Sequence, residues 1–138
     1  MAPQQDLNKL SHCAYALNYH LVLVTKYRHR CITDAILARF EEIARERCAG
    51  WGGALLEVNG EPDHVHLLVS LPPTLKLSGF VNNLKTTSSR LIRRDFADLL
   101  APYYWRPGFW SRSYCLVSCG GAPPEVIKRY IEAQDRPA

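Results

Sequence analysis

The segment formed by residues 15–24 constrains the fold more than any other part of the chain. Apolar residues alternate with polar ones at its start, and towards Val24 both sets of positions are apolar. Alternation with a period of two is typical of a β-strand, and apolar residues on both faces indicate a strand that is covered on both sides. We therefore expect this segment to form a central strand of a sheet.

Five further segments complete the expected secondary structure. They are a helix from the N-cap Thr33 to Gly50, strands at 54–58 and 64–70, a helix from Leu75 or Ser78 to Phe96, and a strand at 109–118. The pair Asn59 and Gly60 predicts the turn between the two middle strands. With right-handed crossovers, this order favours the α+β class, as a ferredoxin-like (split βαβ) antiparallel sheet with two helices on one face. The first and third strands of that fold are central.

The length of 138 residues predicts a single domain over residues 1–138, in which the polar residues 1–12 are expected to be flexible. Five cysteines without a Cys-x-x-Cys pair argue against a disulfide framework or a zinc ribbon and indicate a reducing cytoplasm. No apolar run approaches the ~18 residues of a membrane span, so we expect a cytoplasmic protein with no membrane partner. The formal net charge of +4 suits a polyanionic partner, although an ordinary basic surface would explain it equally well.

Two histidines, His64 and His66, stand one residue apart at the start of an apolar, β-branched run. Because a strand repeats its facing every second residue, both imidazoles should point the same way. They could begin a metal site that takes further ligands from elsewhere, or they could be ordinary polar residues at a strand end. His20 could lie near this pair, or it could be a hydrogen-bonded histidine within the sheet.

Cations and aromatic rings gather in three segments that suit nucleic acid. Residues 26–30 are expected to form a basic turn around Tyr27, in which Lys26 and Arg28 could contact phosphates, and a solvated charged turn is the alternative. The loop at 101–108 is rich in aromatic residues, which suits base stacking, capping of the core or a subunit contact. The helix expected before it carries hydroxyls and cations on its polar side, and a solvated basic surface is the alternative. Its candidate DNA contacts are Lys85, Arg90, Arg93 and Arg94.

The C-terminal segment, residues 120–138, combines a hinge with a helix. Gly120 and Gly121 provide a flexible joint, and the prolines and the acid that follow them favour the start of a helix. Tyr130 and Gln134 are four residues apart, so the phenol and the amide project from one side of that helix. A nucleophile and a possible metal ligand therefore stand together.

Three stretches, residues 19–28, 62–69 and 120–134, occur in an order that resembles the single-tyrosine HUH transposases of the insertion-sequence 200/605 type. The resemblance implies that His64, His66 and Gln134 bind a catalytic Mg²⁺ or Mn²⁺. It also implies that Tyr130 is the nucleophile, and that a homodimer acts on single-stranded DNA with hairpin-containing element ends. Imidazole ligands by themselves would also accept Zn²⁺ or Ni²⁺.

Such an enzyme would cut and rejoin single-stranded DNA through a 5′-phosphotyrosine intermediate. The phosphotyrosine keeps the bond energy, so a 3′-hydroxyl can reverse the step without ATP. Two rival functions remain open. A non-catalytic single-strand binder would need neither Tyr130 nor Gln134. A small metal-dependent hydrolase would use His64 and His66 to activate water, with Asp63 or Glu61 as its carboxylate.

Overall fold

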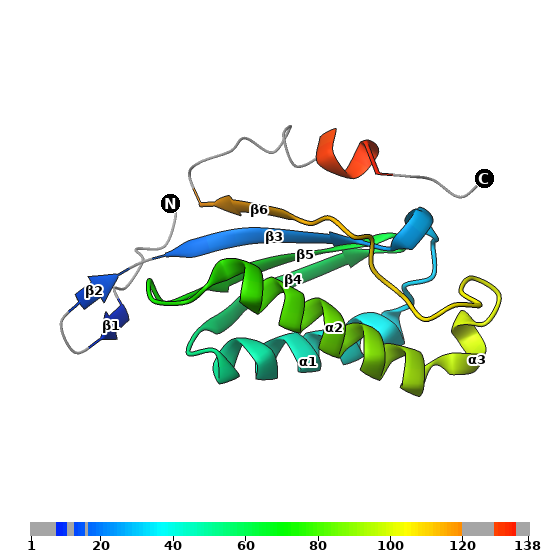
Figure 1. Ribbon diagram of the computed structural model, residues 1–138, viewed down its shortest axis with the longest axis horizontal. Helices are drawn as coiled ribbons and strands as arrows, with labels where there is room; N and C mark the ends of the chain where they lie inside the picture. The colour runs from blue at the N-terminus through cyan, green and yellow to red at the C-terminus, as the bar shows by residue number, and fades with distance from the viewer. Residues whose placement is uncertain (1–7, 11–12, 16, 120–128, 135–138) are drawn as a thin grey trace.

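A four-stranded antiparallel sheet with helices on one face forms the body of the protein (Figure 1). The computed structural model describes residues 8–10, 13–15, 17–119 and 129–134. The sheet strands, in spatial order, are β4 (Ala54–Glu61), β5 (His64–Ser70), β3 (Asn18–Val24) and β6 (Cys115–Ser118). The other elements are β1 (Asn8–Leu10), β2 (Cys13–Tyr15), the 3₁₀ turn η1 (Lys26–Arg28), α1 (Asp34–Gly50), α2 (Leu77–Asp95) and α3 (Ala97–Leu100).

The strand order confirms the ferredoxin-like prediction. Counted along the chain, the first and third sheet strands, β3 and β5, lie in the middle and pair antiparallel with each other. Both α1 and α2 cover the same face (Figure 1). None of the described helices is both long enough and apolar enough to cross a bilayer.

Alternating side chains divide the sheet into two faces. Leu21 and Leu23 in β3, with Val65 and Leu67 in β5, are buried against α1 and α2 in the main hydrophobic core. The opposite face, called here the upper face, bears His20, Val22 and Val24 from β3 and His64 and His66 from β5, because residues that pair directly across strands share a face. Paired imidazoles therefore lie on the side away from the helical layer.

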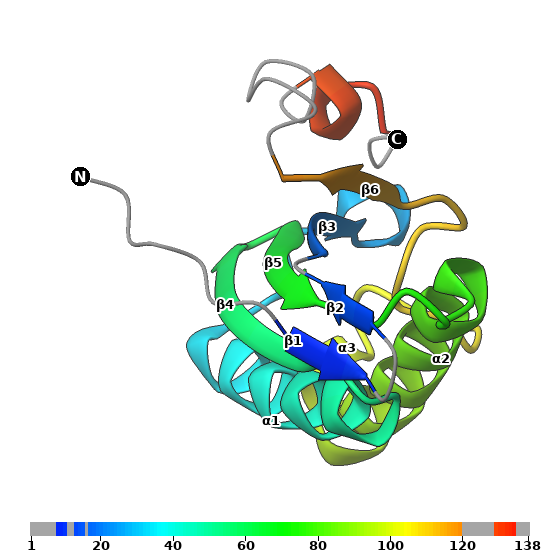
Figure 2. The same ribbon diagram turned by 90° about the vertical axis from the view of Figure 1, so that its left-hand side faces the viewer.

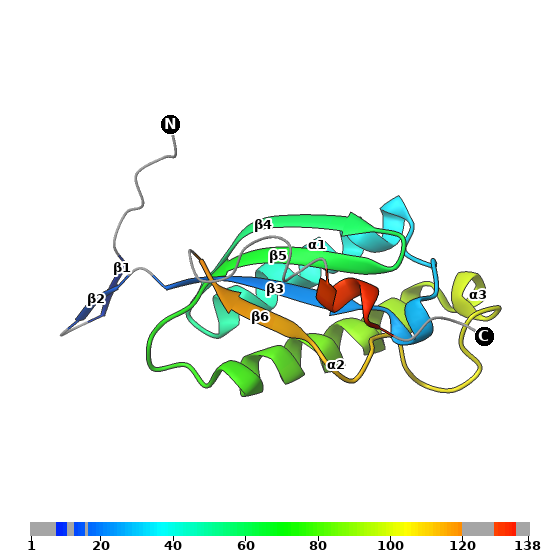
Figure 3. The same cartoon turned by 90° about the horizontal axis from the view of Figure 1, so that it is seen from above.

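The C-terminal residues that the structure describes, 129–134, form a helical turn on the upper face. An amide–carbonyl hydrogen bond from Ala133 to Arg129 closes the turn. Seen from above, the turn lies over β3 and β6 (Figure 3). The expected hinge at Gly120 and Gly121 falls outside the described residues.

The start of α1 confirms its predicted cap. The Thr33 hydroxyl accepts a hydrogen bond from the backbone N–H of Ile36, which satisfies one of the free donors at the helix N-terminus. The second helix also agrees with its expected limits, since α2 runs from Leu77 to Asp95.

The turn predicted at Asn59 and Gly60 is wrong, because both residues lie inside β4 and the chain turns at Pro62 and Asp63. Packing explains the difference. A Cβ built on Gly60 would approach a Leu37 methyl carbon of α1 to 2.7 Å, so a larger residue here would have to displace the Leu37 side chain that packs against the strand.

Two other segments differ from expectation. Of the strand predicted at 109–118, only Cys115–Ser118 joins the sheet, and Trp110 adds an isolated bridge to Thr25. Residues 8–10, expected to be flexible, pair with residues 13–15 in a small two-stranded sheet, which Figure 2 shows at the end of the molecule facing the viewer.

Candidate active site on the upper face

His64 and His66 lie side by side on the upper face, as the strand period predicts. Their cross-strand partners in β3 are Val24 and Val22, and both imidazoles are half-buried while Val65 between them is buried on the helix side. The two rings therefore open towards the same space.

Asp63 fixes the first imidazole. Its Oδ1 lies 2.8 Å from His64 Nδ1, and its Oδ2 accepts hydrogen bonds from Nε and Nη2 of Arg28 at 3.2 and 3.1 Å. Burial alone would raise the pKa of Asp63, but hydrogen bonds from His64 and Arg28 outweigh burial and hold the pKa below its ordinary value. Because an ionised carboxylate can only accept a hydrogen bond, His64 must carry its ring proton on Nδ1. The lone pair of Nε2 is then available to bind a cation.

His20 contacts the second imidazole. Its Nδ1 lies 2.9 Å from His66 Nε2, and the two rings stack with centroids 4.9 Å apart. Burial, and next the electrostatic effect of His20, lower the pKa of His66, which favours the neutral form that metal binding requires. Both interpretations of His20 therefore agree with the structure, since it is hydrogen-bonded within the sheet and also adjoins the paired histidines.

Tyr130 and Gln134 lie together on the helical turn above the sheet. The Tyr130 hydroxyl is 2.8 Å from Ser113 Oγ, and Gln134 Oε1 accepts hydrogen bonds from the hydroxyls of Ser111 and Ser113, each at 3.2 Å. Burial raises the pKa of the Tyr130 phenol, and Cys115 adds to this, whereas the Ser113 hydrogen bond opposes it. The two serines therefore hold Tyr130 and Gln134 as one unit.

This unit and the histidines are separated across the sheet. Cys115, the neighbour of Tyr130, pairs with Val22 from one side, and His66 pairs with Val22 from the other. Two strand spacings of about 4.8 Å therefore separate Cys115 from His66. The structure places all four candidate residues on one face but leaves Tyr130 and Gln134 on the side of β6.

The structure also locates the candidate DNA contacts. Lys85 donates to the carbonyls of Ser111 and Arg112 at 2.7 and 2.9 Å, and burial lowers its pKa. It thus supports the loop that bears the serines. Among the α2 arginines, Arg90 is exposed, Arg93 lines a groove between α2 and residues 107–110, and Arg94 is hydrogen-bonded to Asp95. Lys26 lines two surface pockets.

The two imidazoles and the Gln134 amide are chemically suitable ligands for a divalent metal. Within the described residues, no group of three or more His, Cys, Asp or Glu side chains could hold an ion. Two imidazoles with one amide oxygen would leave coordination positions open, as a catalytic site requires. His64, already oriented by Asp63, fits this role most directly.

Three residues have roles in the site that the sequence does not predict. Arg28, a candidate DNA contact, has its guanidinium paired with Asp63. Ser111 and Ser113, which hold Gln134 and Tyr130, were not selected at all. The only available signal was the position of Asp63 next to His64, because a carboxylate beside a metal-binding histidine commonly orients that ring.

Comparison with known proteins gives consistent matches. Residues 13–134 match the family model described as "Transposase IS200 like". The chain is 32% identical over 120 residues to the ISDra2 transposase TnpA of Deinococcus radiodurans, which covers 87% of this chain and 85% of that protein. It is also 32% identical over 129 residues to the transposase for insertion sequence element IS200 of Salmonella typhimurium, covering 94% of this chain and 84% of that protein.

Solved structures show the same fold. A crystal structure of a transposase from D. radiodurans R1 superposes with a TM-score of 0.83 at 32% identity, covering 94% of this chain and 99% of that one. A REP-associated tyrosine transposase bound to a REP hairpin gives a TM-score of 0.53 at 8% identity, covering 90% and 69%. The second likeness concerns the fold alone.

Proposed function

Because the chain belongs to the IS200-like transposase family, we propose that it cuts and rejoins single-stranded DNA through a phosphotyrosine formed on Tyr130. The observation that carries this proposal is the shared upper face, where a half-buried tyrosine hydroxyl and two neighbouring imidazoles occur together. The ends of an insertion sequence, with hairpins near the cleavage sites, are the proposed substrate.

Tyr130 performs the bond exchange in this proposal. Its phenolate oxygen attacks the phosphorus in line, the P–O3′ bond breaks, and the departing strand takes up a proton as a 3′-hydroxyl. The strand that keeps the 5′-phosphate stays on the tyrosine. A second 3′-hydroxyl can then attack the phosphotyrosine and release Tyr130, which joins a new strand. Ser113, 2.8 Å from the phenol oxygen, orients that oxygen during both steps.

The metal-binding residues proposed are His64, His66 and Gln134, with Mg²⁺ or Mn²⁺ as the working ion. When bound, such an ion would withdraw charge from the phosphate and help to align it. Asp63 acts through His64, since it holds the ring proton on Nδ1 and thereby fixes the direction of the Nε2 lone pair.

We propose a homodimer in which the turn bearing Tyr130 serves the paired histidines of a second subunit. The support is geometric, because the serines hold this turn on the side of β6 and two strand spacings separate the neighbouring Cys115 from His66 of the same chain. Among the residues that the structure describes, the edge strand β6 also has one side without a paired strand, which suits pairing across a two-fold axis.

The test uses single-stranded oligonucleotides from the DNA that flanks the gene, labelled at the 3′ end, with Mg²⁺ or Mn²⁺. A labelled adduct that survives denaturation is expected in the wild type and should be absent in Tyr130→Phe. The 3′ label matters because the fragment with the 5′-phosphate remains attached. An adduct that persists in Tyr130→Phe would transfer the role to another tyrosine. Cleavage without adduct would favour the water-activating hydrolase, and binding without cleavage would favour the non-catalytic binder.

A further inference from the structure

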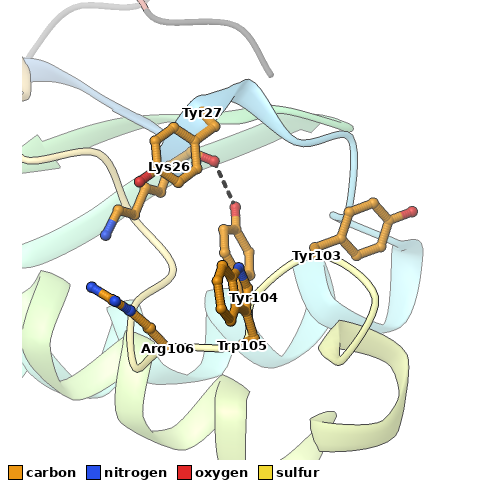
Figure 4. Close-up of a pocket in the computed structure, with 6 residues that line it drawn as sticks. All are labelled: Lys26, Tyr27, Tyr103, Tyr104, Trp105 and Arg106. Atoms are coloured by element: carbon orange, nitrogen blue, oxygen red, sulfur yellow. Dashed lines mark hydrogen bonds between the residues drawn. The ribbon is translucent and has the colours of Figure 1, made fainter. Parts of the chain in front are cut away.

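A cavity of about 190 Å³ lies where the η1 turn meets the loop after α3 (Figure 4). It is called here the aromatic pocket, and it is lined by Lys26, Tyr27, Tyr103, Tyr104, Trp105 and Arg106. We infer that this pocket binds one unpaired base of single-stranded DNA, while the two cations contact the adjoining phosphates. The inference rests on the proposed function only in taking single-stranded DNA as the ligand.

The η1 turn exposes Tyr27 through a strained backbone conformation. Tyr27 and Arg28 both have positive φ angles, 61° and 55°, in the left-handed region that costs a non-glycine residue about 1 kcal/mol or more. The buried Thr25 hydroxyl lies within hydrogen-bonding distance of the carbonyls of His29 and Asp63, and Arg28 is held by the Asp63 carboxylate. These contacts fix the turn, so Tyr27 projects outward with 49% of its surface exposed.

The facing loop is anchored by one aromatic residue and presents another. The hydroxyl of Tyr104 donates to the Lys26 carbonyl at 2.9 Å, and its ring packs near Phe109. The next residue, Trp105, is 90% exposed. A tryptophan displayed on an anchored loop contributes little to the core, whereas an exposed indole beside cations suits a stacking partner. Figure 4 shows Tyr103 pointing away from the other rings.

Both cations of the aromatic pocket lie next to its rings. Lys26 Nζ is 5.4 Å from the centre of the Tyr27 ring, and the Arg106 guanidinium carbon is 5.7 Å from the centre of the Trp105 ring. Their charged ends lie on the same side of the pocket (Figure 4). None of the six lining residues is acidic. Flat rings next to two positive charges match a base with its phosphate, and the cavity is smaller than the ~300 Å³ of whole small-molecule sites.

A second pocket connects this position with the proposed active site. This pocket, about 240 Å³, shares Lys26 and Tyr27 with the aromatic pocket and is also lined by Ser111 and Gln134. The η1 turn therefore separates a base-sized cavity from the residues that hold the proposed metal ligand. A strand whose phosphate lies near Gln134 can pass over the turn and place a neighbouring base beside Trp105.

The experiment compares a single-stranded thymidine 12-mer with an abasic 12-mer of equal length and charge, by fluorescence anisotropy. The variants are Trp105→Ala, Trp105→Tyr and the control Leu56→Ala, which removes an exposed apolar side chain from β4. We expect Trp105→Ala to weaken binding of the thymidine strand by roughly 5- to 100-fold, from the usual stacking contribution of a base. Abasic binding should stay unchanged, Trp105→Tyr should restore most of the loss, and Leu56→Ala should behave as wild type.

Equal losses for both strands, or no loss for either, would overturn the inference. A change in sedimentation mass of Trp105→Ala without a change in the ratio of the two affinities would also overturn it, in favour of a subunit contact. The outcome is independent of cleavage. If the adduct forms but Trp105→Ala affects the thymidine and abasic strands equally, only the inference about the aromatic pocket is refuted. If Trp105→Ala weakens binding of the thymidine strand alone but no adduct forms, only the proposed function is refuted.

Discussion

Replacing Asp63 by Asn tests the most constrained contact of the candidate active site. Asp63 is 6% exposed, and its two oxygens serve His64 and Arg28 separately. An asparagine has one acceptor oxygen, so it can satisfy only one of these partners. If the oxygen faces Arg28, the amide N–H₂ faces His64 and forces the ring proton from Nδ1 to Nε2, which removes the lone pair proposed for the metal. If it faces His64, the partly buried guanidinium loses both hydrogen bonds.

The magnitude follows from these two outcomes. A buried donor left without its partner costs about 1–3 kcal/mol. Arg28 Nη1 has no hydrogen-bond partner, so a guanidinium that also lost Asp63 would keep none of its hydrogen bonds to the described residues. We expect Asp63→Asn to lose about 2 kcal/mol of unfolding free energy, a fall in Tm of roughly 4–8 °C. Loss of the residue that orients a metal-binding histidine typically costs about 10- to 100-fold in metal affinity.

Urea denaturation and calorimetric titration with Mn²⁺ measure the two effects, with Glu61→Gln as a control of equal charge change opposite His64. The pKa of Asp63 lies below its unfolded value, so its stabilisation is present above about pH 4 and is lost as the pH falls through the folded pKa. The difference between wild type and Asp63→Asn should therefore be constant from pH 7 to 5 and shrink below pH 4. Unchanged stability together with unchanged Mn²⁺ affinity would refute the proposed role of Asp63.

Four further predictions follow from other contacts. Ser113→Ala removes the bond that opposes the raised pKa of Tyr130, so adduct formation should slow roughly fivefold at neutral pH and recover at higher pH; a pH-independent loss would point to misplacement of the ring. Gly60→Ala should cost about 1–3 kcal/mol in urea denaturation, because its Cβ meets Leu37, and Leu37→Ala in the same chain should relieve that cost. Neutralising Arg90 or Arg93 should lower the salt slope of DNA binding by about one, while Arg94→Ala, which loses a partner of Asp95, should change it less; equal slopes for all would make α2 ordinary surface. Mixing Tyr130→Phe protein with a His64→Ala, His66→Ala double variant should restore cleavage if the active site is shared, and subunit exchange without activity would restrict each Tyr130 to the histidines of its own chain.

The layers of the fold could be predicted because each rests on local periodicity. The alternation around Leu21 and Leu23 identified a central strand, and Thr33 identified the start of α1. The turn at Asn59 and Gly60 could not be placed correctly, since its turn propensity is outweighed by packing of Leu37 against the glycine.

In the candidate site too, some features follow from local sequence patterns and others do not. The facing of His64 and His66 follows from the strand period alone. The contact of His20 with His66 depends on the register between β3 and β5, and the pairing of Arg28 with Asp63 spans 35 residues. Its geometry also depends on two left-handed residues for which neither tyrosine nor arginine has a preference. Such long-range contacts leave no pattern in the sequence.

The η1 turn limits how far this part of the chain can vary in length. Its neighbouring side chains face opposite ways, since Tyr27 borders the aromatic pocket and Arg28 is bound to the carboxylate that orients His64. An inserted or deleted residue would move both side chains at once. It would therefore disturb the orientation of His64 as well as the aromatic pocket. The loop at 103–106 contacts the chain next to this turn through Tyr103 and Tyr104, whose rings lie near His29, whereas Trp105 is 90% exposed. Changes at residues 105 and 106 should therefore be better tolerated than changes in the η1 turn.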